Sequence, residues 1–158
     1  MNKLYALDVL QRFETHLGDL YQLFAERLQN DPEVAALFGR MALDEYGHAE
    51  LVGYQRRMVE QEPKLLESLD LDEREIYLAT AQVKEARNAA PTLKAEDAVG
   101  RALSFETAAA DYHFRMAKRQ IQADLGEFLV HLGRADEEHQ ARLERLICAV
   151  GLQVPIPL

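Results

Sequence analysis

The chain has 158 residues, of which 48% are hydrophobic and 28% charged, with a formal net charge of −9. This length is typical of one domain with a single core. The acidic charge argues against a nucleic-acid partner, because binding a phosphate backbone needs basic patches. The single cysteine, Cys148, excludes an internal disulfide and a four-cysteine metal site.

The chain shows no signal for export or for membrane insertion. Its first residues are too polar for a signal peptide, and no stretch approaches the roughly 18 apolar residues of a membrane span. We therefore expect a cytoplasmic protein without a membrane partner.

The first half of the chain is expected to form two long helices. Apolar residues recur at helical spacing over residues 4–28, which predicts the first. Asn30 and Asp31 are capping residues and Pro32 suits a first helical turn, so a second helix is predicted over residues 32–62, ended by Pro63.

A surface crossover, two further long helices and a tail are expected in the second half. Residues 64–91 contain a shorter helical pattern and many charges, which is typical of a crossover. A third helix is predicted over residues 94–122. The fourth is predicted to begin after Asp124, which makes a capping pair with Glu127. The prediction is an all-α, up-down four-helix bundle over residues 1–150, followed by a tail (151–158) packed on the bundle or on a neighbouring subunit.

Each predicted helix has an inward apolar stripe that is interrupted near its middle by ionisable side chains. The interrupting residues are Glu14, Glu45, His48, Glu106, Asp136 and His139. A bundle would bring them to one level of the core, where four unpaired carboxylates would each cost several kcal/mol, and no Lys or Arg lies on the stripes. Two divalent cations would supply the missing positive charge. The alternative is that these residues are exposed and the stripes are assigned to the wrong helix faces.

The two halves of the chain repeat these residues. The tripeptide Phe-Glu-Thr occurs around Glu14 and again around Glu106, 92 residues later (106 minus 14). The Glu-x-x-His of residues 45–48 recurs as Asp-x-x-His at residues 136–139. Residues three apart share a helix face, so one turn can present an oxygen and a nitrogen to the same ion. This mixed donor set suits iron, with manganese or zinc possible, and is too rich in nitrogen for calcium.

These motifs resemble those of the ferritin-like di-iron carboxylate proteins, especially the rubrerythrin and bacterioferritin branches. In that family two helices each supply one glutamate and two others each supply Glu-x-x-His. The resemblance implies a ferritin-like fold and two iron ions with Glu14 and Glu106 as terminal ligands. It also implies that Glu45 and Asp136 bridge the ions. His48 and His139 would each cap one ion.

The resemblance also extends to two residues beside the predicted ligands, and the sequence departs from the family pattern at three points. Tyr21 stands where the family has a tyrosine that hydrogen-bonds a ligand carboxylate, although it could be a plain core aromatic. His113 takes the same place in the second half, as either a core histidine or a proton-delivery group. Asp136 is one methylene shorter than the usual glutamate, Ala109 replaces an extra rubrerythrin glutamate, and one cysteine cannot form a rubredoxin module.

The resemblance implies a ferroxidase- or peroxidase-type oxidoreductase that reacts with dioxygen or hydrogen peroxide. Electrons would come from an external donor, and the protein would form a homodimer or a higher homo-oligomer. Two alternatives stay open: iron storage in a hollow oligomer, and a single-metal or metal-free helical interaction module. Cys148 is expected to be a small buried side chain near the end of the fourth helix.

Overall fold

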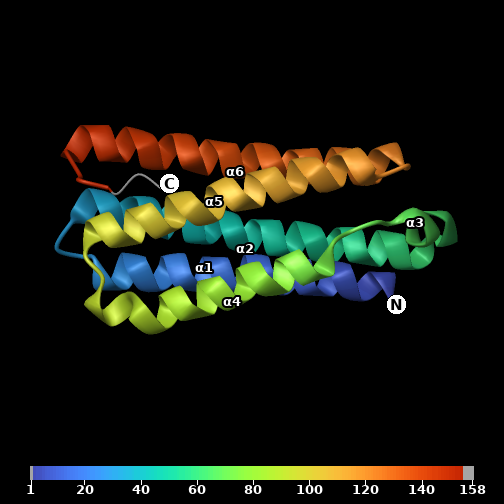
Figure 1. The fold of residues 1–158 in the computed structure, drawn as a ribbon, viewed down its shortest axis with the longest axis horizontal. Helices are drawn as coiled ribbons and strands as arrows, with labels where there is room; N and C mark the ends of the chain where they lie inside the picture. Colours follow the sequence, from blue (N-terminus) through green and yellow to red (C-terminus); the bar gives the residue numbers. More distant parts are fainter. Residues whose placement is uncertain (1, 155–158) are drawn as a thin grey trace.

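The computed structural model describes residues 2–154, and all regular structure in that range is helical. Four long helices form the bundle: α1 (Lys3–Arg27), α2 (Pro32–Gln61), α5 (Ala95–Arg119) and α6 (Ala123–Val150). Helices α1 and α2 pack as one antiparallel hairpin and α5 and α6 as another (Figure 1). The predicted all-α, ferritin-like four-helix bundle is confirmed.

The crossover between α2 and α5 contains more structure than the single helix predicted. It consists of α3 (Pro63–Ser68), α4 (Glu73–Ala89) and the 3-10 turn η1 (Ala90–Thr92). Pro63 follows the end of α2, as predicted, but it also starts α3, since proline fits a first helical turn. Helix α4 packs along α1 and carries the chain back to the end where α2 begins, so that α5 runs parallel to α2 (Figure 1).

Two predicted helix caps are wrong in detail. Helix α6 begins at Ala123, so Asp124 lies inside its first turn instead of capping it. A carboxylate there still interacts favourably with the positive end of the helix dipole. Asp31 occupies the capping position of α2, but its side chain makes no capping hydrogen bond. The start of α2 therefore depends on Pro32, whose ring already holds a helical backbone angle.

The predicted apolar stripes form the core. Leu7, Leu17 and Leu132 are fully buried, and the rings of Phe24 and Phe38 lie 5.1 Å apart in an edge-to-face contact. Tyr21 packs on Phe38 with ring centroids 5.6 Å apart. This aromatic layer from α1 and α2 keeps water out of the middle of the bundle.

The C-terminal end departs from the predictions at one residue. Cys148 is exposed, because it lies on the outer face of α6 with Glu144 and Arg145, whereas Leu143 and Leu146 of the same turns face the core. Leu152 and Val154 of the predicted tail pack partly against the core, whereas residues 155–158 lie outside the described residues. Within residues 2–154, no helix combines the length and the apolar composition that crossing a membrane needs.

Candidate metal centre

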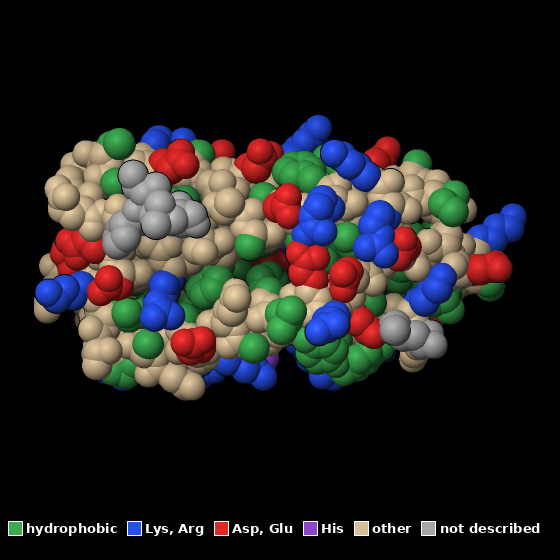
Figure 2. Space-filling view, viewed as in Figure 1, with side chains coloured by type: hydrophobic (Ala, Val, Ile, Leu, Met, Phe, Trp, Pro, Cys, Tyr) green, Lys and Arg blue, Asp and Glu red, His purple; other side chains and the backbone are tan. Residues whose placement is uncertain are grey.

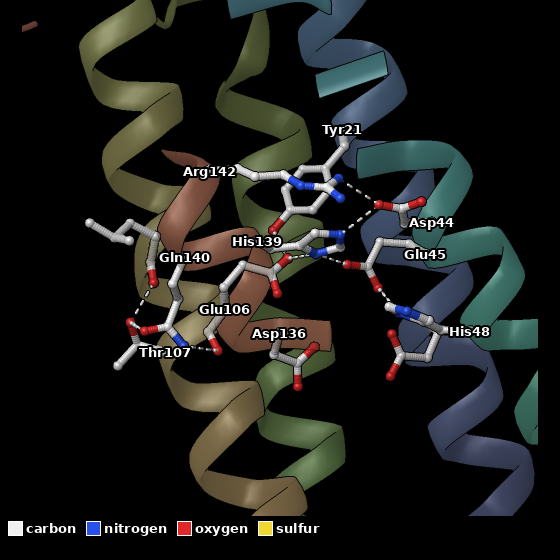
Figure 3. Close-up of polar contacts among 12 residues, drawn as sticks. Tyr21, Asp44, Glu45, His48, Glu106, Thr107, Asp136, His139, Gln140 and Arg142 are labelled. Carbon is white, nitrogen blue, oxygen red and sulfur yellow. Dashed lines mark hydrogen bonds and ion pairs between the residues drawn. The ribbon is translucent and has the colours of Figure 1, made fainter. Parts of the chain in front are cut away.

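Four carboxylates meet in the middle of the bundle, one from each long helix. Glu14, Glu45, Glu106 and Asp136 are each at most 1% exposed. His139 is buried beside them, and His48 is half-buried (Figure 3). The alternative in which the ionisable residues face solvent is thus ruled out for the carboxylates, and the helix faces were assigned correctly.

The ligand atoms fall into two adjacent groups that share one carboxylate. Glu14, Glu45 and His48 offer atoms that all lie within 4.8 Å of one another, and so do Glu45, Glu106 and His139. Glu45 belongs to both groups, so its two oxygens can face two different ions. The structure therefore brings five of the six predicted ligands into two candidate metal positions. Asp136 lies in the same buried cluster but in neither group.

The cluster disfavours its own negative charge. Burial raises the pKa of Glu14 well above its ordinary value, and the neighbouring Glu45 raises it further. Burial and repulsion from Glu106 raise the pKa of Glu45 to about 8. Burial lowers the pKa of His139, but its contacts with Glu106 and Glu45 outweigh this and raise it to about 12. Each shift has the same meaning: the site takes up protons unless another cation occupies it.

Several buried polar atoms of the cluster have no hydrogen-bond partner among the described residues. They include both carboxylate oxygens of Glu14, Oε1 of Glu45, Oε2 of Glu106 and Nδ1 of His139. Buried polar atoms are normally paired, and unpaired ones call for an explanation such as an ion. Nδ1 of His139 lies 3.0 Å from Oε1 of Glu45 and 3.2 Å from Oε1 of Glu106. These convergent donor atoms fit a metal ion.

Asp44 orients His139, a contact that the sequence analysis missed. Its Oδ2 lies 3.0 Å from Nε2 of His139 and 3.1 Å from Nη1 of Arg142 (Figure 3). When a metal ion replaces the proton on Nδ1, the N–H of Nε2 still donates to Asp44 and the lone pair of Nδ1 faces Glu45 and Glu106. A carboxylate that orients a metal-binding histidine in this way is common in metalloproteins. The sequence signal is weak, because Asp44 is a half-exposed residue 95 positions away from its partner.

Tyr21 supports a carboxylate of the second group. Its hydroxyl donates a hydrogen bond of 2.8 Å to Oε1 of Glu106. The tyrosine thus reaches across from α1 to α5 instead of holding Glu14 on its own helix. Burial and the charge of Glu106 raise the pKa of Tyr21 well above 10, so the phenol stays a donor.

Asp136 is paired with His113. Nδ1 of His113 lies 2.6 Å from Oδ2 of Asp136, and its Nε2 lies 3.6 Å from Oε1 of Glu14. Burial lowers the pKa of His113, which favours a neutral imidazole. The predicted bridging role of Asp136 therefore competes with a short hydrogen bond to this histidine.

The comparisons with known proteins agree with this site. The sequence pattern of the rubrerythrin family matches residues 12–147, which include all six predicted ligands. No curated protein matches the chain. No solved structure matches it either.

Proposed function

Because the chain belongs to the rubrerythrin family, we propose that its buried cluster holds two iron ions and that the protein is an oxidoreductase acting on dioxygen or hydrogen peroxide. The observation that carries the proposal is the sharing of Glu45 between two groups of ligand atoms. A buried carboxylate that belongs to both groups could hold two neighbouring ions.

The chain's residues divide between the two ions. Glu14 and His48 would hold one ion, Glu106 and His139 the other, and Glu45 would bridge them. When bound, two ferrous ions would supply two electrons to the oxidant. Carboxylate and imidazole donors also accept manganese or zinc, so the choice of iron rests on the family.

The surrounding side chains would orient the ligands and exclude water. Asp44 holds the ring of His139, and Tyr21 holds the carboxylate of Glu106. The aromatic layer of Phe24 and Phe38 closes the bundle on the side of Tyr21. Exclusion of water strengthens the interactions of charged groups inside and prevents side reactions.

We also propose an external electron donor and a homodimer or larger oligomer. Cys148 alone cannot build an iron–sulfur or rubredoxin-type centre within this sequence. Leu43, Tyr54 and Met58 are exposed apolar side chains of α2, which supports self-association through this helix. A hollow oligomer of many subunits in light scattering would favour iron storage, whereas a monomer or dimer would exclude a storage shell.

The test is an anaerobic ferrous titration of metal-free protein, followed by rapid mixing with dioxygen or with peroxide. We expect two ferrous ions per chain and an absorbance change on mixing that shows which oxidant reacts faster. The Glu45→Gln variant should lose tight binding of the ion pair, whereas Glu60→Gln, an exposed glutamate on the same helix, should not. Only trace iron after dialysis of the loaded protein would refute the proposal.

A further inference from the structure

A cavity of about 190 Å³ lies between α1, α4 and α5. It exists because α4 packs along α1 but barely touches α5, and because Ala79, Ala108 and Ala109 place small side chains in the gap. Figure 2 shows a hollow with hydrophobic side chains near the middle of this face, between α5 and α4. The cavity opens to solvent beside Leu78, which is 59% exposed.

The walls of the cavity are mainly apolar and partly aromatic. Leu10, Phe13, Ile76 and Phe105 line it, and Glu75, Gln82 and His113 are polar residues of its lining. Tyr112 also lines it, but the tyrosine hydroxyl is already used in a hydrogen bond to the carbonyl of Asp72. An apolar cavity of about 150 Å³ stays dry and accepts benzene. The larger volume here suits a molecule of one or two rings.

The inner end of the cavity adjoins the candidate metal centre. It is lined by Ala109 and His113, both buried. Ala109 follows Glu106 by one helical turn, and Phe13 directly precedes Glu14. His113 itself contacts Glu14, with 3.6 Å between Nε2 and Oε1. An occupant of the cavity would therefore touch His113, which itself contacts Glu14 of the first ligand group.

We propose that this cavity binds a compact aromatic molecule, the organic reactant of the neighbouring metal centre. Aromatic rings are favoured because Phe13, Phe105 and Tyr112 offer ring faces and edges. A rigid ring also loses little conformational entropy on binding. The role as reactant rests on the proposed function, whereas binding in the cavity does not require the metal.

Indole is a suitable probe, because the chain contains no tryptophan and indole fluorescence can be excited apart from tyrosine. We expect a saturable shift of indole emission to shorter wavelength with both metal-free and zinc-loaded protein. Ala109→Leu should fill the inner end and weaken binding at least about tenfold, which is about 1.4 kcal/mol, with zinc stoichiometry unchanged. Ala81→Leu, an exposed alanine of α4 outside the cavity, is the matched control. In cobalt-loaded protein, indole should alter the cobalt absorption spectrum.

The outcomes separate this proposal from the proposed function. Absence of indole binding to a protein that still takes up two metal ions overturns the cavity proposal alone. Indole binding by a protein that takes up no metal supports the cavity and removes the proposed function. Equal weakening by the two leucine variants would place the indole elsewhere. If binding weakens as the protein dimerises at higher concentration, a second copy fills the cavity and the proposal fails.

The His113–Asp136 pair carries a second inference. Nδ1 of His113 and Oδ2 of Asp136 share a hydrogen bond of 2.6 Å. With the proton on Nδ1, the Nε2 lone pair faces Glu14. This Nε2 atom is buried and has no hydrogen-bond partner among the described residues. Metal bonds to nitrogen and oxygen of about 2.0–2.2 Å allow one ion to bind two donors 3.6 Å apart.

We infer that His113 is a ligand of the ion held by Glu14, and that Asp136 orients this histidine instead of bridging the two ions. The pair then has the same design as Asp44 with His139 in the other half of the site. The shorter aspartate side chain suits this role, because it leaves room for the imidazole between the carboxylate and Glu14.

X-ray absorption of zinc-loaded protein tests the inference by counting imidazole ligands. We expect three per pair of ions, falling to two in His113→Gln and staying at three in His131→Gln, an exposed histidine of α6. Asp136→Asn should keep the count and weaken zinc binding about 10- to 100-fold. Two imidazoles in the unaltered protein, or tighter binding in Asp136→Glu, would overturn the inference and restore Asp136 as the bridge.

Discussion

Replacing Glu45 with Gln should have opposite effects on the metal-free and the metal-loaded protein. Glu45 lies in both groups of ligand atoms, and burial together with Glu106 raises its pKa from 4.5 to about 8. A carboxyl whose pKa is higher in the native state than in the unfolded state makes its full contribution to the free energy of unfolding below the unfolded-state pKa. That contribution is lost as the pH rises through the native-state pKa. Gln keeps the shape but cannot ionise, so the variant escapes this loss.

The size of this stability difference follows from the pKa shift of Glu45. About 3.5 pKa units at about 1.4 kcal/mol each correspond to about 5 kcal/mol once Glu45 is ionised in both states, above pH 8. At pH 7, where the native carboxyl is still mostly protonated, the same linkage gives about 3 kcal/mol. At pH 5 it gives less than about 1 kcal/mol. Metal-free Glu45→Gln should therefore be more stable than the unaltered protein, by an amount that grows from pH 5 to pH 9.

Urea unfolding in the presence of a chelator at pH 5, 7 and 9 measures this difference, with Glu60→Gln as an exposed control on the same helix. With zinc in place of chelator the order should reverse, because two ions, each at 1,000 times its dissociation constant, together stabilise the native state by about 8 kcal/mol. A metal-free variant that is less stable than the unaltered protein at pH 9, or a difference that does not change with pH, would refute the reasoning.

Three further substitutions test the surroundings of the site. Asp44→Asn should lower the metal affinity of the His139 position about 10- to 100-fold in a chelator competition, because the imidazole loses the carboxylate that orients it. Unchanged affinity would mean that the carboxylate of Asp44 matters only for its ion pair with Arg142. Tyr21→Phe removes the donor to Glu106 and should lower the free energy of unfolding by about 1–3 kcal/mol in urea; no loss would argue that water replaces the hydroxyl. Phe38→Ala should lower it by about 3–5 kcal/mol, since this ring is fully buried between Tyr21 and Phe24. A loss below about 1 kcal/mol would show that the aromatic layer is loosely packed.

Local spacing determined which residues reach the core. A helix repeats every 3.6 residues, so an apolar stripe and the ionisable residues on it share one face wherever the helix packs. For this reason the spacing alone predicts that Glu14, Glu45, Glu106 and Asp136 lie in the interior, and all four are buried there. The same reasoning does not reach the helix ends, where Asp124 lies inside the first turn of α6 instead of capping it.

Only the tertiary structure decided how these side chains meet. Whether Glu45 faces two ions, whether Tyr21 reaches Glu106, and whether Asp136 turns to His113 all depend on the rotation and spacing of neighbouring helices. Sequence separations within one helix do not contain that information. The cavity beneath α4 is decided in the same way, because it is the space left when a helix packs on α1 but barely touches α5. The sequence by itself therefore determined the helical fold and which ionisable residues reach the core, and the packing between helices determined which of them meet.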